Sequence, residues 1–179
     1  MALAASAAAQ IPCSPTTAKT KQERTKLKHR TFAASSQATT VYVNNILDWA
    51  APANFDDAAV RKAALEHGGT PTDPREVQPW KVYKVRAKLW RVVMEDNDCD
   101  FHLELGGLKK GKTGYRIIAE IPNDPGFADS RHALIQALTA AGKTISAGQD
   151  VKLDTPIIVE VRGFPFYDSA HYSKKYPKQ

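Results

Sequence analysis

Residues 95–105 (EDNDCDFHLEL) bring acids and an imidazole together at a spacing that could support chemistry. From Asp98 onward polar and apolar residues alternate strictly, and side chains in a β-strand point to opposite faces with a period of two. The segment therefore predicts a strand over 98–105 with one buried face and one wet face. The wet face would carry Asp98, Asp100, His102 and Glu104, and the buried face Cys99, Phe101, Leu103 and Leu105.

A divalent metal site is the first chemistry that this row suggests. Successive residues on one strand face lie about 6.5–7 Å apart, so two neighbours can share an ion, whereas four in a row span about 20 Å and cannot. A second element must supply further ligands, and Asp168 and His171 are the candidates. Two His with carboxylates suit zinc or iron, and carboxylates alone favour calcium or magnesium. The predicted metal set is Asp98, Asp100, His102, Asp168 and His171.

Acid–base chemistry is the second possibility, with Asp100, His102 and Glu120 as catalytic candidates, because neighbouring carboxylates push each other's pKa values apart. The competing interpretation is a wet sheet face without chemistry. On that interpretation the acids of 98–105 form cross-strand ion pairs with Lys84, Arg86 and Lys88 of the preceding strand. The sequence leaves open whether the protein is an enzyme.

The elements that would hold this row follow from the same patterning. Val82–Met94 predicts a long strand, and a change of apolar parity around Arg91 (Trp90, Val92, Met94) predicts a bulge in it. Asp96-Asn97 predicts the turn into strand 98–105. Further strands are predicted over Tyr115–Ile121 and Ile157–Phe166.

A helix is predicted over Ser130–Ala141, with Asp129 as its N-cap and Gly142 at its end. Its inward residues would be Leu134, Ile135, Leu138 and Ala141. Three strands, a helix and another strand give the order of an OB-fold, a five-stranded Greek-key β-barrel. Either Val151–Leu153 is a short fourth strand and 157–166 the fifth, or the closing strand is missing; we slightly favour the latter.

The chain begins with a segment of different composition. Residues 19–30 carry a net charge of +5 and the tail 172–179 a net charge of +3, so removing both from the chain's +6 leaves −2 for the rest. The basic leader from Lys19 to Arg30 could bind an anionic ligand or nucleic acid, or be only a solvated segment. The Ala-rich start resembles the end of a signal peptide with a cleavage site at Ala7–Ala9.

The sequence suggests four parts. Residues 1–40 form a signal remnant or disordered basic leader, 41–79 a short helical segment (including Val43–Trp49) and Pro-rich linker, 80–171 the OB-like barrel, and 172–179 a basic tail. No run of residues approaches the roughly 18 apolar residues of a transmembrane segment. Cys13 and Cys99 can pair in an oxidising compartment, although a buried free thiol at Cys99 is the favoured expectation.

Three sequence blocks carry a resemblance. E-x-x-D-x-D-F-H-L-x-L (Glu95–Leu105), I-I-A-E-I-P (Ile117–Pro122) and V-x-G-F-x-F-Y-D-x-x-H (Val161–His171) resemble a family of small, uncharacterised bacterial proteins. Many members are exported, and most continue into a further segment before which this chain ends. The resemblance implies an exported, C-terminally shortened member and transfers no activity. Secreted thermonucleases are a looser likeness, in which Arg116 and Glu120 would mimic part of the catalytic set.

These observations predict a mainly β protein with flanking helices and a disordered N-terminal leader. The expected function is a ligand- or partner-binding module of the cell envelope, secreted or periplasmic. The alternatives are a cytoplasmic location and a metal-dependent, nuclease-like hydrolase that uses the Asp/His strand face.

Overall fold

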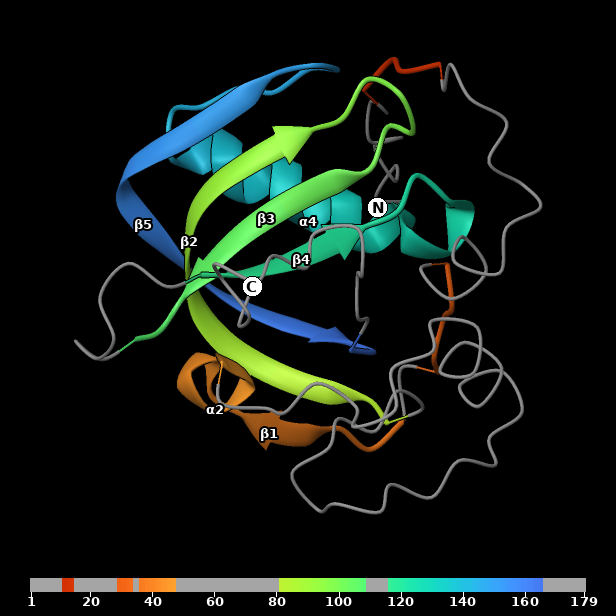
Figure 1. Cartoon of the computed structure of the whole chain (residues 1–179). Coiled ribbons are helices and arrows are strands. Elements are labelled where there is room, and N and C mark those ends of the chain that lie inside the picture. Colours follow the sequence, from red (N-terminus) through yellow and green to blue (C-terminus); the bar gives the residue numbers. More distant parts are fainter. Residues whose placement is uncertain (1–10, 15–28, 34–35, 48–80, 109–115, 166–179) are drawn as a thin grey trace, which may run out of the picture.

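The computed structural model describes residues 11–14, 29–33, 36–47, 81–108 and 116–165. Its described part is mainly β: a curled sheet forms half a barrel, with few helices (Figure 1). The strands are β1 (Thr39–Val41), β2 (Tyr83–Met94), β3 (Phe101–Gly106), β4 (Ile117–Ile121) and β5 (Asp150–Gly163). The helices are α2 (Val43–Leu47), the 3-10 turn η1 (Pro125–Phe127) and α4 (Ala128–Ala140). None of the described helices is long and apolar enough to cross a membrane.

Strand β2 is the centre of the sheet. Antiparallel β5 pairs with it along one edge, while on the other edge parallel β1 pairs with its first residues and antiparallel β3 with its last. Strand β4 then pairs with β3. Because β2 contacts three strands, its side chains decide what the two faces of the half-barrel carry.

The predicted bulge in β2 is confirmed. Pairing with β3 moves from Leu89–Leu105 to Arg91–Glu104, so Trp90 is the extra residue. On the other edge Leu89 pairs with Ile157 and Arg91 with Lys152, which leaves four residues of β5 opposite Trp90 alone. Both neighbouring strands therefore bend at the same point, and the sheet curls there.

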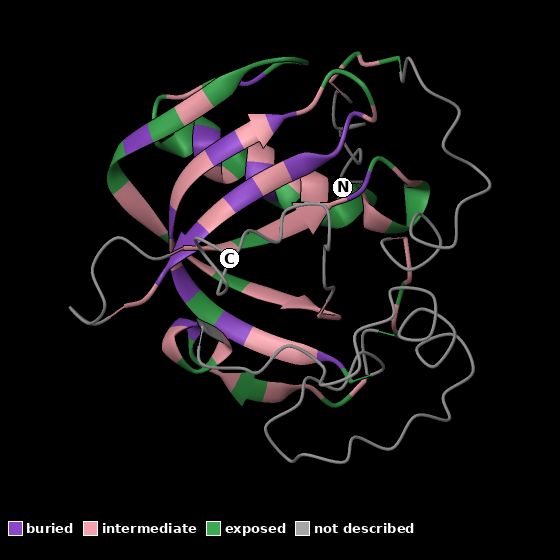
Figure 2. Ribbon diagram, viewed as in Figure 1, coloured by how far each residue is buried: buried purple, intermediate pink, exposed green. Residues whose placement is uncertain are grey.

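The inner face carries the predicted apolar residues. Along β2 the buried residues are Val85, Ala87 and Leu89 before the bulge, then Val92 and Met94 after it, and Figure 2 shows the alternation. Phe101, Leu103 and Leu105 of β3 are also buried, as predicted. Helix α4, behind the sheet in Figure 1, adds Leu134 and Leu138 to this core.

Several expectations for the second half of the domain need correction. Val151–Leu153 and 157–163 belong to one bent strand, β5, so they are not two strands. Asp129 lies in the first turn of α4 instead of capping it. Phe127 is the N-cap residue of α4 and gives no side-chain cap, whereas the Asp124 side chain caps the preceding turn η1. Ala141 is exposed, because the helix ends at Ala140 and Gly142 follows with a φ of 69°.

The described parts of the N-terminal 47 residues are attached to the barrel, which differs from the disorder that composition predicts for 10–40. Thr39–Val41 pairs with β2, and Val43 of α2 is 2% exposed in the core. The helix predicted from Val43 ends at Leu47 in the described residues. The second predicted helix and the linker lie outside them, and the domain limits remain a prediction.

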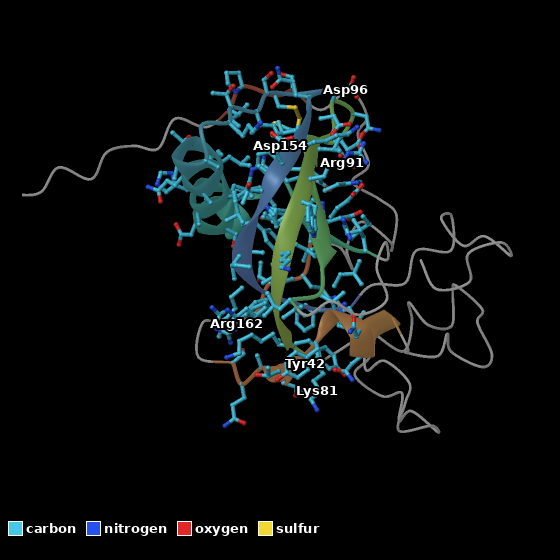
Figure 3. The ribbon with its side chains drawn as sticks, turned by 90° about the vertical axis from the view of Figure 1, so that its left-hand side faces the viewer. Tyr42, Lys81, Arg91, Asp96, Asp154 and Arg162 are labelled. Atoms are coloured by element: carbon cyan, nitrogen blue, oxygen red, sulfur yellow. A yellow bond between two sulfur atoms is a disulfide. The ribbon has the colours of Figure 1, made fainter. Side chains whose placement is uncertain are left out.

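A disulfide joins Cys13 to Cys99, with Cα atoms 5.9 Å apart and a sequence separation of 86. The expectation of a free thiol at Cys99 is therefore wrong. Cys99 has a φ of 63° and is fully buried, so it turns the chain before β3 instead of belonging to the strand. In Figure 3 the yellow disulfide lies at the end of the molecule that carries Asp96 and Asp154.

A second anchor of the N-terminal segment is a stack of rings and guanidinium groups. Phe32 meets Phe164 edge to face with centroids 5.7 Å apart, Arg30 lies 4.3 Å above the Phe164 ring, and Arg162 lies 5.4 Å above the Phe32 ring. Burial lowers the pKa of Arg30. Such contacts hold a segment without secondary structure against the end of β5.

Candidate functional site

The polar row predicted over 98–105 is divided by the structure. Because β3 begins at Phe101, Asp98 and Asp100 lie outside the strand. Asp100 is 2% exposed, and its Oδ1 accepts a hydrogen bond from the backbone N–H of Asn123 at 2.8 Å. Its own N–H is donated to Asp98 Oδ1 at 3.3 Å. Asp100 therefore joins the start of β3 to the chain after β4, instead of facing solvent as predicted.

Arg131 of α4 reinforces this junction. Its guanidinium lies 4.2 Å from the Phe101 ring centroid and donates to the carbonyl of Ile121 at 3.2 Å. Burial lowers the pKa of Arg131, and the charge of Asp100 opposes that shift. The arrangement positions α4 on the sheet, which is a structural role.

His102 and Glu120 are brought together, as the candidate catalytic set requires. They lie opposite each other on β3 and β4, with His102 Nε2 3.4 Å from Glu120 Oε1. A residue outside the predicted set, Glu95, completes the arrangement, with Oε1 3.7 Å from His102 Nδ1. The imidazole thus lies between two carboxylates near the end of β2. The sequence signal was the alternation of polar His102 with apolar Phe101, which predicted His102 on the outer face of the strand.

The metal set is only partly described. Asp168 and His171 lie outside the described residues, and Asp100 is occupied by a backbone N–H. In the described ranges no group of three or more His, Cys, Asp or Glu residues is arranged to hold an ion. The divalent metal and the hydrolase stay predictions; metal analysis of the purified protein with an H102A control would test both.

Glu104, the last member of the row, takes part in an ion-pair network with Arg91. Arg91 Nη1 lies 2.6 Å from Glu104 Oε1, while its Nε and Nη2 donate to the two oxygens of Asp150 at 2.7 and 2.8 Å. These hydrogen bonds lower the pKa of Asp150 and raise that of Arg91. The bidentate pair joins β2 to β5, and Figure 3 shows Arg91 at the same end as Asp154.

The predicted cross-strand pairing of the three cations of β2 is wrong in register. Lys88 lies opposite Gly106, so the acids of β3 lie opposite β2 residues beyond the bulge. On the other edge Lys84 faces Arg162, Arg86 faces Glu160 and Lys88 faces Ile158. Within the described part of the chain, Lys84, Arg86 and Lys88 have no ion pair. We call these three residues the basic row.

The bulge residue adjoins the basic row. The Arg116 guanidinium lies 4.7 Å from the Trp90 ring centroid. Both side chains reach Gly106, where a Cβ would lie 2.8 Å from Trp90 Nε1 and 3.3 Å from Arg116 Nη1. Only glycine leaves room for this contact. Sequence analysis grouped Trp90 with the inward residues, and an aromatic residue at a parity change was the available signal.

A shallow depression of about 400 Å³ lies between the end of α4 and the start of β5. It is lined by Gly142, Lys143, Thr144, Gln149, Asp150, Val151 and Lys152. No predicted site residue borders it, and Asp150 there is engaged by Arg91. The outer face around β2 is therefore the better candidate surface.

Comparison with protein-family models, with curated proteins and with solved structures finds no match for this chain. The site must be judged from its own geometry.

Proposed function

We propose that the protein is an exported, OB-like binding module that holds an anionic ligand on the basic row. One observation carries this proposal: three cations lie on one face of β2 with no ion pair among the described residues. Like charges two residues apart on a strand repel, and a polyanion whose successive groups contact all three cations relieves the repulsion. The acids of β3 lie beyond the bulge, and Glu160, which lies opposite Arg86 on β5, forms no ion pair with it among the described residues.

The order of elements supports the OB-like part of the proposal. A long bent strand, two further antiparallel strands, a helix and a strand that returns to the first one follow in that order. OB-folds bind ligands on the sheet face of their second and third strands and on adjoining loops. The basic row and Trp90 border the corresponding strand, β3.

The Cys13–Cys99 bond supports the proposed export, because structural disulfides persist in oxidising compartments such as the periplasm and the exterior. The resemblance to exported bacterial proteins agrees with it. If the hypothesis of a signal peptide is right, the cellular protein starts near Gln10. An intact Met1 in its mass spectrum would contradict export by this route.

The basic leader is proposed as an auxiliary to the same ligand. Residues 15–28 lie outside the described part, whereas Arg30 stacks on Phe164 near Arg162. Arg162 lies opposite Lys84 in the β2–β5 pair. The leader thus reaches the described structure close to one end of the basic row, where its charge would strengthen the attraction of an anion.

A matched pair of double variants tests the proposal. Arg86→Gln/Lys88→Gln removes two charges from the basic row, and Lys143→Gln/Lys152→Gln removes two elsewhere. We expect the first to weaken binding to immobilised dextran sulfate about tenfold or more, since one lost charge contact is worth roughly 1 kcal/mol. The second should change it less than about twofold. The proposal would be overturned if both double variants lost the same affinity for dextran sulfate. It would also be overturned if the wild type were retained equally on neutral dextran and on dextran sulfate.

A further inference from the structure

Arg116 contacts the Trp90 ring at the end of the basic row. Its guanidinium stacks on Trp90 at 4.7 Å from the ring centroid, and its Nη1 lies over Gly106. Gly106 is the direct pairing partner of Lys88. The stacked guanidinium therefore adjoins the cation that ends the basic row.

The stack leaves the donors of Arg116 available. A guanidinium that lies on an aromatic ring keeps its N–H groups in its own plane, pointing away from the ring. Within the described residues Arg116 has no hydrogen-bond acceptor and no ion pair. A planar fork of donors, oriented in advance and unoccupied, matches the geometry of an oxyanion that accepts two parallel hydrogen bonds.

The surroundings indicate what carries the oxyanion. Ile158, 47% exposed, lies opposite Lys88 on β5, so apolar and cationic side chains adjoin each other. Such a surface suits a polymer with both apolar ring faces and acidic groups. The disulfide favours an oxidising compartment and so a polymer found outside the cytosol, and we take this polymer to be an acidic polysaccharide.

We propose that Arg116, oriented by Trp90, binds an acidic group of a linear polysaccharide through two parallel hydrogen bonds, while the basic row binds the neighbouring acidic groups. This inference rests on the proposed function and adds to it a ligand class and a residue that sets specificity. It requires the planar fork of Arg116 and not only its charge.

Two variants separate the fork from its charge. Arg116→Lys keeps the charge and loses the fork. Gly106→Ala keeps every charge and forces Trp90 to move, because its Cβ would lie 2.8 Å from the indole nitrogen. Gly163→Ala is the matched control, since nothing lies within 4 Å of a Cβ at that strand glycine. Thermal melting of all three checks that they fold.

The probe is polygalacturonate, measured by isothermal titration calorimetry beside dextran sulfate and an oligo-dT strand. We expect Arg116→Lys and Gly106→Ala to weaken polygalacturonate binding about five- to tenfold, the cost of roughly 1–1.4 kcal/mol for one charge-assisted bond. Gly163→Ala should bind like the wild type. Wild-type affinity in a folded Arg116→Lys variant would contradict the proposed role of Arg116.

The same variants and probes also distinguish failure of this inference from failure of the proposed function. If Arg86→Gln/Lys88→Gln weakens binding while Arg116→Lys does not, the proposed ligand binding by the basic row is supported and the proposed role of Arg116 is wrong. If oligo-dT binds more tightly than both polysaccharides, the assignment to a polysaccharide is wrong. If no polyanion binds the wild type, the proposed function itself fails.

Discussion

The two halves of β2 on either side of Trp90 carry cations in opposite circumstances. Before the bulge, Lys84, Arg86 and Lys88 have no ion pair among the described residues. After it, Arg91 makes two pairs, with Asp150 and Glu104. One strand thus contains a half whose cations have no ion pair among the described residues and a half whose cation has two, and pairing register decides which is which.

The imidazole beyond the bulge fits the same comparison. His102 sits between Glu95 and Glu120, so it too has charged neighbours within the sheet. Charged side chains of the half after the bulge form ion pairs across strands, and Lys84, Arg86 and Lys88 of the half before it form none among the described residues. Four experiments test this difference between the two halves.

The largest effect concerns the disulfide, which anchors the half beyond the bulge to the N-terminal segment. Cys13→Ser opens a loop of 86 residues, so we expect the free energy of unfolding in urea to fall by about 3–5 kcal/mol. Dithiothreitol should destabilise the wild type similarly and leave the variant unchanged. An unfolding midpoint shared by variant and oxidised wild type would show that the bond does not stabilise this end.

Asp100 is the second test, because its buried carboxylate joins β3 to the chain after β4. Asp100→Ala leaves the N–H of Asn123 without this acceptor, which costs about 1–3 kcal/mol. Asp154→Ala is the control: its side chain is 95% exposed, and the expected change is within about 0.5 kcal/mol. Equal unfolding midpoints for the two variants would remove the structural role assigned to Asp100.

Arg86 and Arg91 allow a reciprocal test within one strand. Arg91→Gln should lower the free energy of unfolding by about 0.5–1 kcal/mol, discounted because its side chain is 35% exposed, and leave dextran sulfate binding unchanged. Arg86→Gln should weaken that binding and leave the unfolding midpoint unchanged. Arg91→Gln weakening binding as much as Arg86→Gln does would erase the functional difference between the halves.

The smallest effect is a pH dependence that only the half beyond the bulge should show. Hydrogen bonds from Arg91 lower the pKa of Asp150 below its ordinary value of 3.8. Between the lowered pKa and that value the unfolded state binds more protons, so stability rises with pH there. The contribution is fully present above the ordinary value and is lost as pH falls through the folded-state pKa.

Urea unfolding between pH 6 and pH 2 measures this contribution as the difference between wild type and Asp150→Asn. The difference should shrink as the solution becomes more acidic. It should be small, because the Asp150 side chain is 41% exposed and solvent screens the pair. A constant difference across that range would mean that the ion pair is not coupled to folding.

Much of the sheet could be predicted because alternation is a local property. Burial of Phe101 and Leu103 followed from the period of two, and the change of parity near Arg91 located the bulge. The helix was predicted within about two residues, since Leu134 and Leu138 share a face and Gly142 ends it. These features depend on residues close together in the chain.

The contacts of the site could not be predicted in the same way. Nothing near Cys99 in sequence shows that it pairs with Cys13, and the alternation that begins at Asp98 conceals the positive φ of Cys99. Arg91 and Asp150 are 59 residues apart, and Arg116 meets Trp90 across a segment that includes β3. Partners of this kind depend on strand register, which no single segment contains.

The inward residues of β2 and β3, the interruption of β2 and the end of α4 could be read from local patterns, because steric preferences and hydrophobic burial act on neighbouring residues. Which cations have acidic partners depends on long-range contacts. One extra residue at Trp90 moves the acids of β3 past the basic row, and Glu160 of β5, opposite Arg86, forms no ion pair with it among the described residues. Long-range pairing therefore gives ion pairs to the cation in one half of β2 and none, among the described residues, to the cations in the other half.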